Sequence, residues 1–226
     1  IIPSNVKVIE SKAFQWCKKL FSVEFSPKSN LELIESYAFS NTSIEIISIP
    51  SSVTKIGEYA FNKCVNLKIF NFMENSKICS IDIGVFAYTH IKSIKIPSSV
   101  ISICQLSFLD CLDLKKIEIS EDSQLRLIEK HAFQNDPIED ILIPSSFDEF
   151  HEDWCKELKK LVNVSLSPKN IEFSLINNNK IMVGKSSKIS NIYDVLIFAC
   201  RDINNVEIPS TIKRITPYSF SECRKL

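Results

Sequence analysis

The sequence predicts an α/β solenoid, in which one parallel β-sheet alternates with short helical or irregular return segments. The first observation is a period of 47 residues, which separates Pro3, Pro50, Pro97 and Pro144. The second is a short apolar pattern that occurs eight times, mostly 23 or 24 residues apart. A fixed period of about 20–50 residues is typical of solenoids, whose units bury apolar surface only against their neighbours. We therefore expect residues 1–226 to form one elongated domain.

The repeated pattern, apolar-x-x-apolar-x-apolar, predicts the strands. It reads Ile44-Glu-Ile-Ile-Ser-Ile49 and, one unit later, Leu67-Lys-Ile-Phe-Asn-Phe72. Its last three residues alternate apolar, polar, apolar and favour Ile, Val and Phe, which is typical of a half-buried strand. Strands linked by a return segment each time stack in parallel. We expect at least eight, centred near residues 23, 47, 70, 94, 117, 141, 164 and 206.

The segment between strands carries a second pattern, seen in Ile34-Glu-Ser-Tyr-Ala-Phe39 and Ile56-Gly-Glu-Tyr-Ala-Phe61. An Ile five residues before the Phe would lie on the same side of a short helical turn as the Ala-Phe pair. Such a turn is too short to be stable alone, so it must dock on the sheet. We expect the aromatic residues of this slot to form a buried ladder, since each ring buries a large area: Phe39, Phe61, Phe86, Phe108 and Phe133.

In these slots the chain resembles the BspA-like leucine-rich repeats, also called the Treponema-type class. Their unit is similar to Leu-x-x-Ile-x-Ile-Pro-x-x-Val-x-x-Ile-Gly-x-x-Ala-Phe-x-x-Cys, and residues 44–64 match almost every slot. The resemblance covers essentially the whole chain and implies a leucine-rich-repeat horseshoe. It also implies a cell-surface or secreted location, because the family occurs in surface proteins of bacteria and parasitic protists, some of them adhesins. No binding residue can be transferred, because the family has no ligand motif at fixed slots.

The spacing is interrupted once, in an enlarged repeat at residues 167–202. Residues 171–176 and 180–183 flank Asn177-Asn-Asn179 and predict a β-hairpin, because Asn tolerates the positive φ of tight turns. A third strand is expected at residues 192–200. Two interpretations stay open: a ligand-binding excursion, or a β-variant of the return segment that keeps the core filled. The chain begins and ends inside repeats, so we expect it to be a segment of a longer protein.

Composition argues against several function classes. The 27 basic and 27 acidic residues balance, which argues against binding nucleic acid or anionic membranes through bulk charge. The apolar run at residues 195–200 is far too short to cross a bilayer, and the start does not read as a signal peptide. With three glycines and no catalytic motif, we expect no enzyme activity and no cofactor.

The positions of the cysteines and histidines favour a role in packing over a role in disulfide formation or metal binding. Cys17, Cys64, Cys111 and Cys223 share one slot, and neighbours in that slot should lie two strands apart, roughly 9.5 Å. A disulfide needs Cα atoms within about 7 Å, so we expect buried free thiols. The stretch His151-Glu-Asp-Trp-Cys155 could suggest a metal site, but its spacing matches no zinc pattern. Asn41 and Asn163 begin glycosylation sequons, which matter only in a secreted chain.

We therefore expect a non-enzymatic protein-binding scaffold, used at a cell surface for adhesion or for contact with a host or extracellular protein. The alternative is a recognition module attached to a catalytic or signalling domain outside this segment. Ile46 and Ile69 should lie exposed on neighbouring strands. The other candidate contacts are residues at outward or adjoining positions, although ordinary surface would look similar: Lys92, Lys95, Lys116, Glu118, Asp140 and Leu142.

Overall fold

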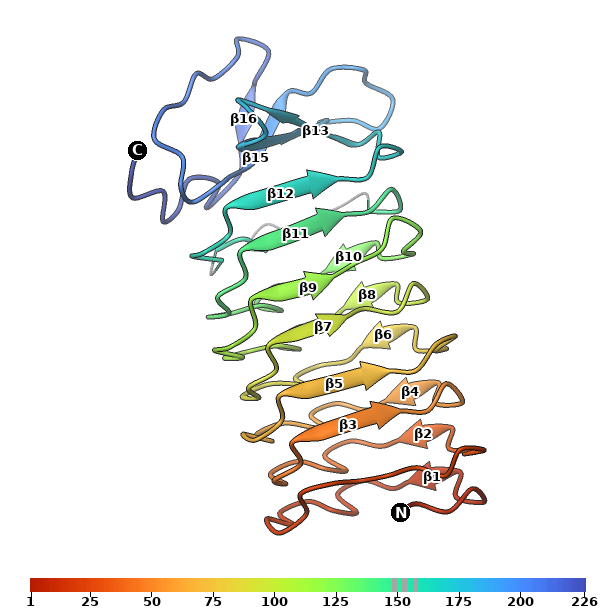
Figure 1. Ribbon diagram of the computed structural model, residues 1–226. Helices are drawn as coiled ribbons and strands as arrows, with labels where there is room; N and C mark the ends of the chain where they lie inside the picture. Colours follow the sequence, from red (N-terminus) through yellow and green to blue (C-terminus); the bar gives the residue numbers. More distant parts are fainter. Residues whose placement is uncertain (148–149, 152–153, 157) are drawn as a thin grey trace.

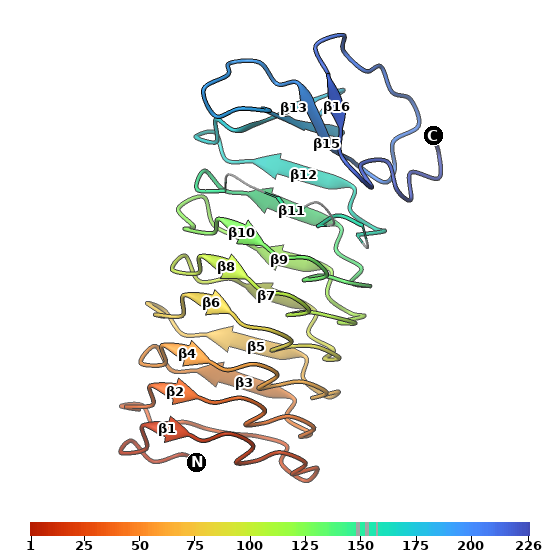
Figure 2. The ribbon, with the colours of Figure 1, turned by 180° about the vertical axis from the view of Figure 1, so that it is seen from behind.

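The computed structural model is an elongated stack of repeats with the two termini near opposite ends (Figures 1 and 2). It describes residues 1–147, 150–151, 154–156 and 158–226. Two columns of parallel strands run along the stack, one in front and one behind in Figure 1. Within the described residues the structure contains strands and turns but no helix. The solenoid is therefore as expected, and the expected helical return segments are wrong.

The front column contains the predicted strands. Its members are β3 (Ile46–Ile49), β5 (Ile69–Phe72), β7 (Ser93–Lys95), β9 (Lys116–Glu118), β11 (Asp140–Ile143) and β12 (Asn163–Leu166). Along each strand, exposed and buried side chains alternate, as the pleat requires. The middle apolar residue of each copy, such as Ile47, lies in the core.

The expectation of one sheet with at least eight strands is wrong. The six strands form two sheets, β3-β5 and β7-β9-β11-β12. Near residue 23 only the bridges Ser22↔Ile46 and Ile2↔Phe25 form. No strand forms near residue 206, because the antiparallel strands of the enlarged repeat follow β12 and leave Asn204 and Asn205 exposed.

The back column was not expected. It consists of β1 (Val8–Ile9), β2 (Leu33–Ile34), β4 (Lys55–Ile56), β6 (Ser80–Ile81), β8 (Ser102–Ile103) and β10 (Leu127–Ile128). These strands pair in parallel as β1-β2-β4 and β6-β8-β10. The isoleucine that was expected to open a helical turn, such as Ile34, is instead the inward-facing residue of a two-residue strand.

Backbone geometry explains why the return segment is not helical. Tyr37 and Asn41 both have φ of 59°, a left-handed conformation that a right-handed helix cannot contain. The N–H of Ala38 donates to Glu35 O at 3.2 Å and closes a turn, whereas the N–H of Phe39 donates to Ala60 O in the next repeat at 2.8 Å. The backbone donors therefore alternate between a local turn and the neighbouring repeat.

The phenylalanine ladder is confirmed. Phe39 and Phe61 are fully buried and their ring centroids are 5.3 Å apart. The ladder continues through Phe86, Phe108 and Phe133 at 6.2, 5.2 and 5.5 Å. These near-parallel rings form the axis of the core between the two strand columns.

The C-terminal part departs from the repeat. Strands β13 (Phe173–Ile176) and β14 (Ile181–Gly184) form an antiparallel hairpin, and all three turn asparagines have positive φ. Strand β15 (Val195–Ala199) pairs antiparallel with β14 and parallel with β16 (Arg214–Ile215). The buried guanidinium of Arg201 donates to Cys155 O at 2.7 Å and to Ser219 O at 3.1 Å, which ties this part to the solenoid.

Candidate binding face

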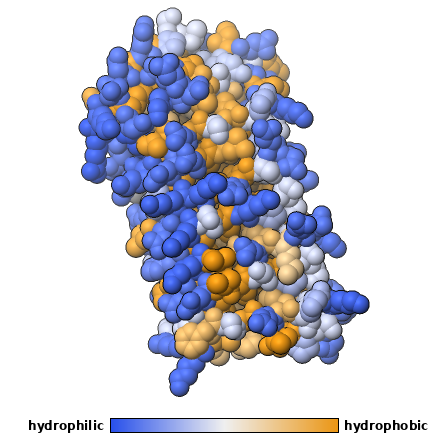
Figure 3. All heavy atoms as spheres, in the orientation of Figure 1, coloured by the Kyte–Doolittle hydropathy of each residue, from blue (hydrophilic) through white to orange (hydrophobic). Residues whose placement is uncertain are grey.

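The outward side chains of the six front strands form what we call the front face. Ile46 and Ile69 are direct register partners there, 52% and 46% exposed. Alternation along the strands requires this, because their neighbours Ile47 and Phe70 point into the core. Met73 is 50% exposed and lines a shallow pocket together with Ile46. Figure 3 shows apolar surface in this region, with hydrophilic side chains on either side.

The charged residues expected on this face divide into two groups. The ammonium of Lys116 lies 2.9 Å from Glu118 Oε1, and Asp140 Oδ1 accepts a hydrogen bond from Asn163 Nδ2 at 2.6 Å. These side chains already have partners within the chain. Leu142 is only partly exposed, at an outward position within β11.

The second group consists of exposed lysines, and one of them, Lys68, was not predicted from the sequence. Lys92 and Lys95 are exposed, and no ion pair involves them in the described part of the chain. Lys68 belongs beside them, because the N–H of Lys92 donates to Lys68 O at 3.4 Å. The N–H of Lys115 donates in turn to Lys92 O at 3.1 Å. Lys68, Lys92 and Lys115 therefore occupy the same position in three successive levels of the stack. Their shared slot, the second position of the strand pattern, is visible in the sequence.

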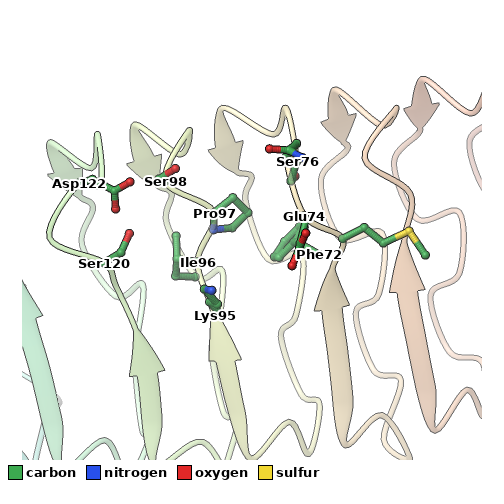
Figure 4. Close-up of a pocket in the computed structure, with 11 residues that line it drawn as sticks. Phe72, Glu74, Ser76, Lys95, Ile96, Pro97, Ser98, Ser120 and Asp122 are labelled. Carbon is green, nitrogen blue, oxygen red and sulfur yellow. The ribbon is translucent and has the colours of Figure 1, made fainter.

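A surface pocket of about 410 Å³ lies between β5 and β7, where Lys68, Ile69, Lys92 and Lys95 line it together with the carboxylate of Glu118. A second pocket adjoins it where these strands end (Figure 4). There Phe72 and Lys95 are joined by the carboxylates of Glu74 and Asp122. The face therefore carries positive charge toward the beginning of the strands and mixed charge toward their ends.

The groups with altered pKa lie off this face. Burial raises the pKa of the Cys64 and Cys111 thiols, whose sulfurs sit 3.3 Å from the hydroxyl oxygens of Thr42 and Thr89. Asp136 occupies the same slot as those threonines, 47 residues beyond Thr89. Burial raises the pKa of its carboxyl, and its Oδ2 has no hydrogen-bond partner.

The remaining sequence candidates do not form a chemical site. Trp154 and Cys155 are buried as expected, His151 is exposed, and residues 152 and 153 lie outside the described residues. No three His, Cys, Asp or Glu side chains of the described residues are placed to hold a metal ion. Likewise, no helix in the described ranges is long and apolar enough to span a membrane.

None of the cysteines in the described residues forms a disulfide. Cys64, Cys111 and Cys155 are buried, but Cys17 is exposed and Cys223 partly exposed, against expectation. The Cys64 thiol donates to Phe39 O in the preceding repeat. Cys17 lies in the first repeat that the structure describes, and Cys223 lies in the irregular C-terminal part.

Comparison with known proteins identifies the repeat type. The model of the BspA type leucine rich repeat region matches six copies, over residues 1–98, 79–182 and 173–226. No curated protein sequence matches the chain significantly.

Solved structures share the fold. A leucine-rich repeat protein from Bacteroides ovatus is 23% identical, with a TM-score of 0.73 over 100% of this chain and 58% of its own. The pneumococcal vaccine antigen PcpA is 22% identical, with a TM-score of 0.70 over 95% of this chain and 48% of its own. A leucine-rich cell surface protein from Faecalibacterium prausnitzii is 20% identical, with a TM-score of 0.62 over 90% and 59%. The chain thus spans about half the length of these structures.

Proposed function

The chain belongs to the BspA-type leucine-rich repeat family, and from this premise we propose that it is a non-enzymatic scaffold that binds a protein through its front face. Leucine-rich repeats generally serve as binding scaffolds, and a stacked sheet presents an extended surface to a large partner. We further propose a role in adhesion or partner contact at a cell surface. Support for that location comes from the family and from relatives described as a vaccine antigen and a cell surface protein.

The observation that carries the proposal is the pair Ile46 and Ile69. Two β-branched apolar side chains stand opposite each other on the exposed side of a strand pair, where polar residues would favour solubility. Met73 extends this surface. A compact apolar centre with a polar rim is the usual arrangement of a protein interface.

The other residues of the face fit the rim of such an interface. Lys92 and Lys95 would steer an acidic partner and raise its association rate more than its affinity. The paired side chains of Lys116, Glu118 and Asp140 would contribute little beyond complementarity, because each is already satisfied within the chain. A bound partner would cover the partly exposed side chain of Leu142.

We also propose that residues 1–226 act as one solenoid unit of a longer protein, and that the enlarged repeat serves packing. All residues of β14 and β15 are buried, which supports a structural use of this segment. Their side chains form a small second core around Ile181, Val183 and Leu196.

The test is cell binding by the purified chain and by the double variant Ile46→Thr/Ile69→Thr. Threonine keeps the β-branched shape, so the melting temperature should stay within a few degrees of the parent. Loss of an apolar interface centre of about 2–3 kcal/mol would weaken binding roughly 30- to 150-fold. The matched control is Val8→Thr/Ile101→Thr, which changes two exposed apolar residues at the back column, one in β1 and one directly before β8. Unchanged binding by the folded Ile46/Ile69 variant would refute the proposal.

A further inference from the structure

The stack is interrupted at one level in both strand columns. Within the described residues, β5 and β7 belong to separate sheets in front, and so do β4 and β6 behind. The ring centroids of Phe61 and Phe86, which meet at this level, are 6.2 Å apart, the widest step in the ladder. We call this level the seam.

The turns between the columns hold the seam together. The N–H of Phe61 donates to Val85 O at 3.0 Å, and that of Lys63 donates to Ala87 O at 2.8 Å. The Phe70 ring fills the wider gap edge-on, 4.6 Å from the ring of Phe86. The seam is therefore closed in the core and open on the front face, where the 410 Å³ pocket lies.

Three lysines and one carboxylate line the groove of the seam, and the carboxylate, Glu118, is already paired with Lys116 at 2.9 Å. Lys68, Lys92 and Lys95 line it, and none of them has an ion pair among the residues that the structure describes. Lys68 and Lys92 occupy adjacent rungs, joined by a backbone hydrogen bond. Like charges directly opposite each other destabilise a sheet, so folding alone does not favour this arrangement. An anionic partner would relieve it.

Charge also gives the groove a direction. Lys68 and Lys92 lie directly before the first residues of β5 and β7, whereas Lys95 is the last residue of β7. Lys95 also lines the adjoining pocket beyond the strand ends, together with Glu74 and Asp122 (Figure 4). A negatively charged ligand is therefore attracted more strongly at the first end, where Lys68 and Lys92 lie, than at the second end, where Lys95 lies among carboxylates. The exposed side of Ile69 borders the basic end.

We propose that the seam groove binds an acidic segment of a protein partner, with carboxylates on Lys68, Lys92 and Lys95 and an apolar side chain against Ile69. This deepens the proposed function and rests on it, since it names the chemistry of the partner. A polypeptide fits better than a sulfated glycan, because a peptide offers apolar side chains for Ile69 and Phe72 as well as anions for the lysines.

The test uses defined probes with the full chain. A short fluorescent peptide that combines glutamates with two leucines should bind, and its affinity should fall as salt rises. The same peptide with glutamines should bind about tenfold or more weakly, and so should the acidic peptide to the variant Lys68→Glu/Lys92→Glu. The matched control is Lys12→Glu/Lys130→Glu, which reverses two exposed lysines in the return turns and should leave binding unchanged.

Two results would overturn the inference. One is equal binding of the acidic peptide to the parent and to Lys68→Glu/Lys92→Glu. The other is binding of a heparin oligosaccharide that depends on these lysines while the peptide does not bind. Neither result touches the Ile46/Ile69 cell-binding test, so failure of the acidic-partner inference and failure of the proposed function are distinguishable.

Discussion

Replacing Phe61 with Ala removes an interior member of the phenylalanine ladder, between Phe39 and Phe86. The side chain is fully buried, and its ring lies 5.3 Å from Phe39, 6.2 Å from Phe86 and, edge-on, 5.1 Å from Phe70. The substitution therefore opens a cavity that is bordered by three aromatic rings. These rings are themselves fixed by packing, so the site cannot collapse fully.

The expected cost is about 3–5 kcal/mol of unfolding free energy, the usual range for a buried Phe replaced by Ala. Phe14 provides a matched comparison, because it occupies the same slot but is partly exposed, and among the described residues it stacks on Phe39 alone, at 5.2 Å. Phe14→Ala should cost about 1–2 kcal/mol, since less apolar surface leaves water when this side chain packs.

Urea unfolding gives the two free energies, and amide hydrogen exchange shows where the loss falls. In a solenoid the contacts are between neighbouring repeats, so Phe61→Ala should lower protection at Phe39 and Phe86 before it affects β12. A cost below about 1 kcal/mol for Phe61→Ala, or equal costs for both variants, would refute the assignment of this slot to the core.

Three further predictions concern single positions. Asp136→Thr, which restores the residue of the other repeats, should raise stability by about 1–3 kcal/mol at neutral pH, because it removes a buried oxygen without a partner. Because burial raises the pKa of Asp136, the parent should lose stability relative to this variant as pH rises above the unfolded pKa of about 4. Urea unfolding measures the difference in unfolding free energy between the two proteins, and a difference that does not depend on pH would contradict this. Gly84→Ala should cost about 1–2 kcal/mol for the backbone, since φ is +60°, plus the displacement of the Tyr59 ring that the added Cβ would meet; an unchanged free energy of unfolding would disprove it. Cys79 should react rapidly with a thiol reagent in the folded chain and Cys111 should not, because one is exposed and the other buried with a raised pKa; equal rates would contradict the structure.

The front strands and the phenylalanine ladder could be predicted from the sequence because their signals are periodic and side-chain based. Ile47 and Ile49 alternate with Ser48, and the Phe slot recurs with fixed spacing. Both features follow from burial alone. The same reasoning placed Ile46 and Ile69 on the outside, where the structure has them.

The back column could not be found in this way. A two-residue strand such as Leu33–Ile34 is too short to show alternation. The left-handed φ of Tyr37 and Tyr59 has no sequence signal either, because bulky residues rarely adopt it. Inter-repeat hydrogen bonds select this conformation, so it depends on the neighbouring units rather than on local preference.

The candidate site was predictable only in part. Lys68 shares its slot with Lys92 and Lys115, so the column of lysines could have been read from the repeat. The pairing of Lys116 with Glu118 and of Asp140 with Asn163 depends on side-chain positions that spacing does not give. The seam depends on which neighbouring strands pair. The strand patterns start 23 or 24 residues apart on both sides of it, so their spacing does not predict the break.

The most direct test of the front face as the binding surface is a scan of cell binding, in which exposed residues are replaced by Ala one at a time. The scan covers the front face, the back column and the hairpin around Asn177–Asn179. The account predicts that the losses cluster on Ile46 and Ile69 and extend toward Lys92, while back-column variants such as Ile101→Ala bind like the parent. Losses that cluster on the back column or on the hairpin would contradict it.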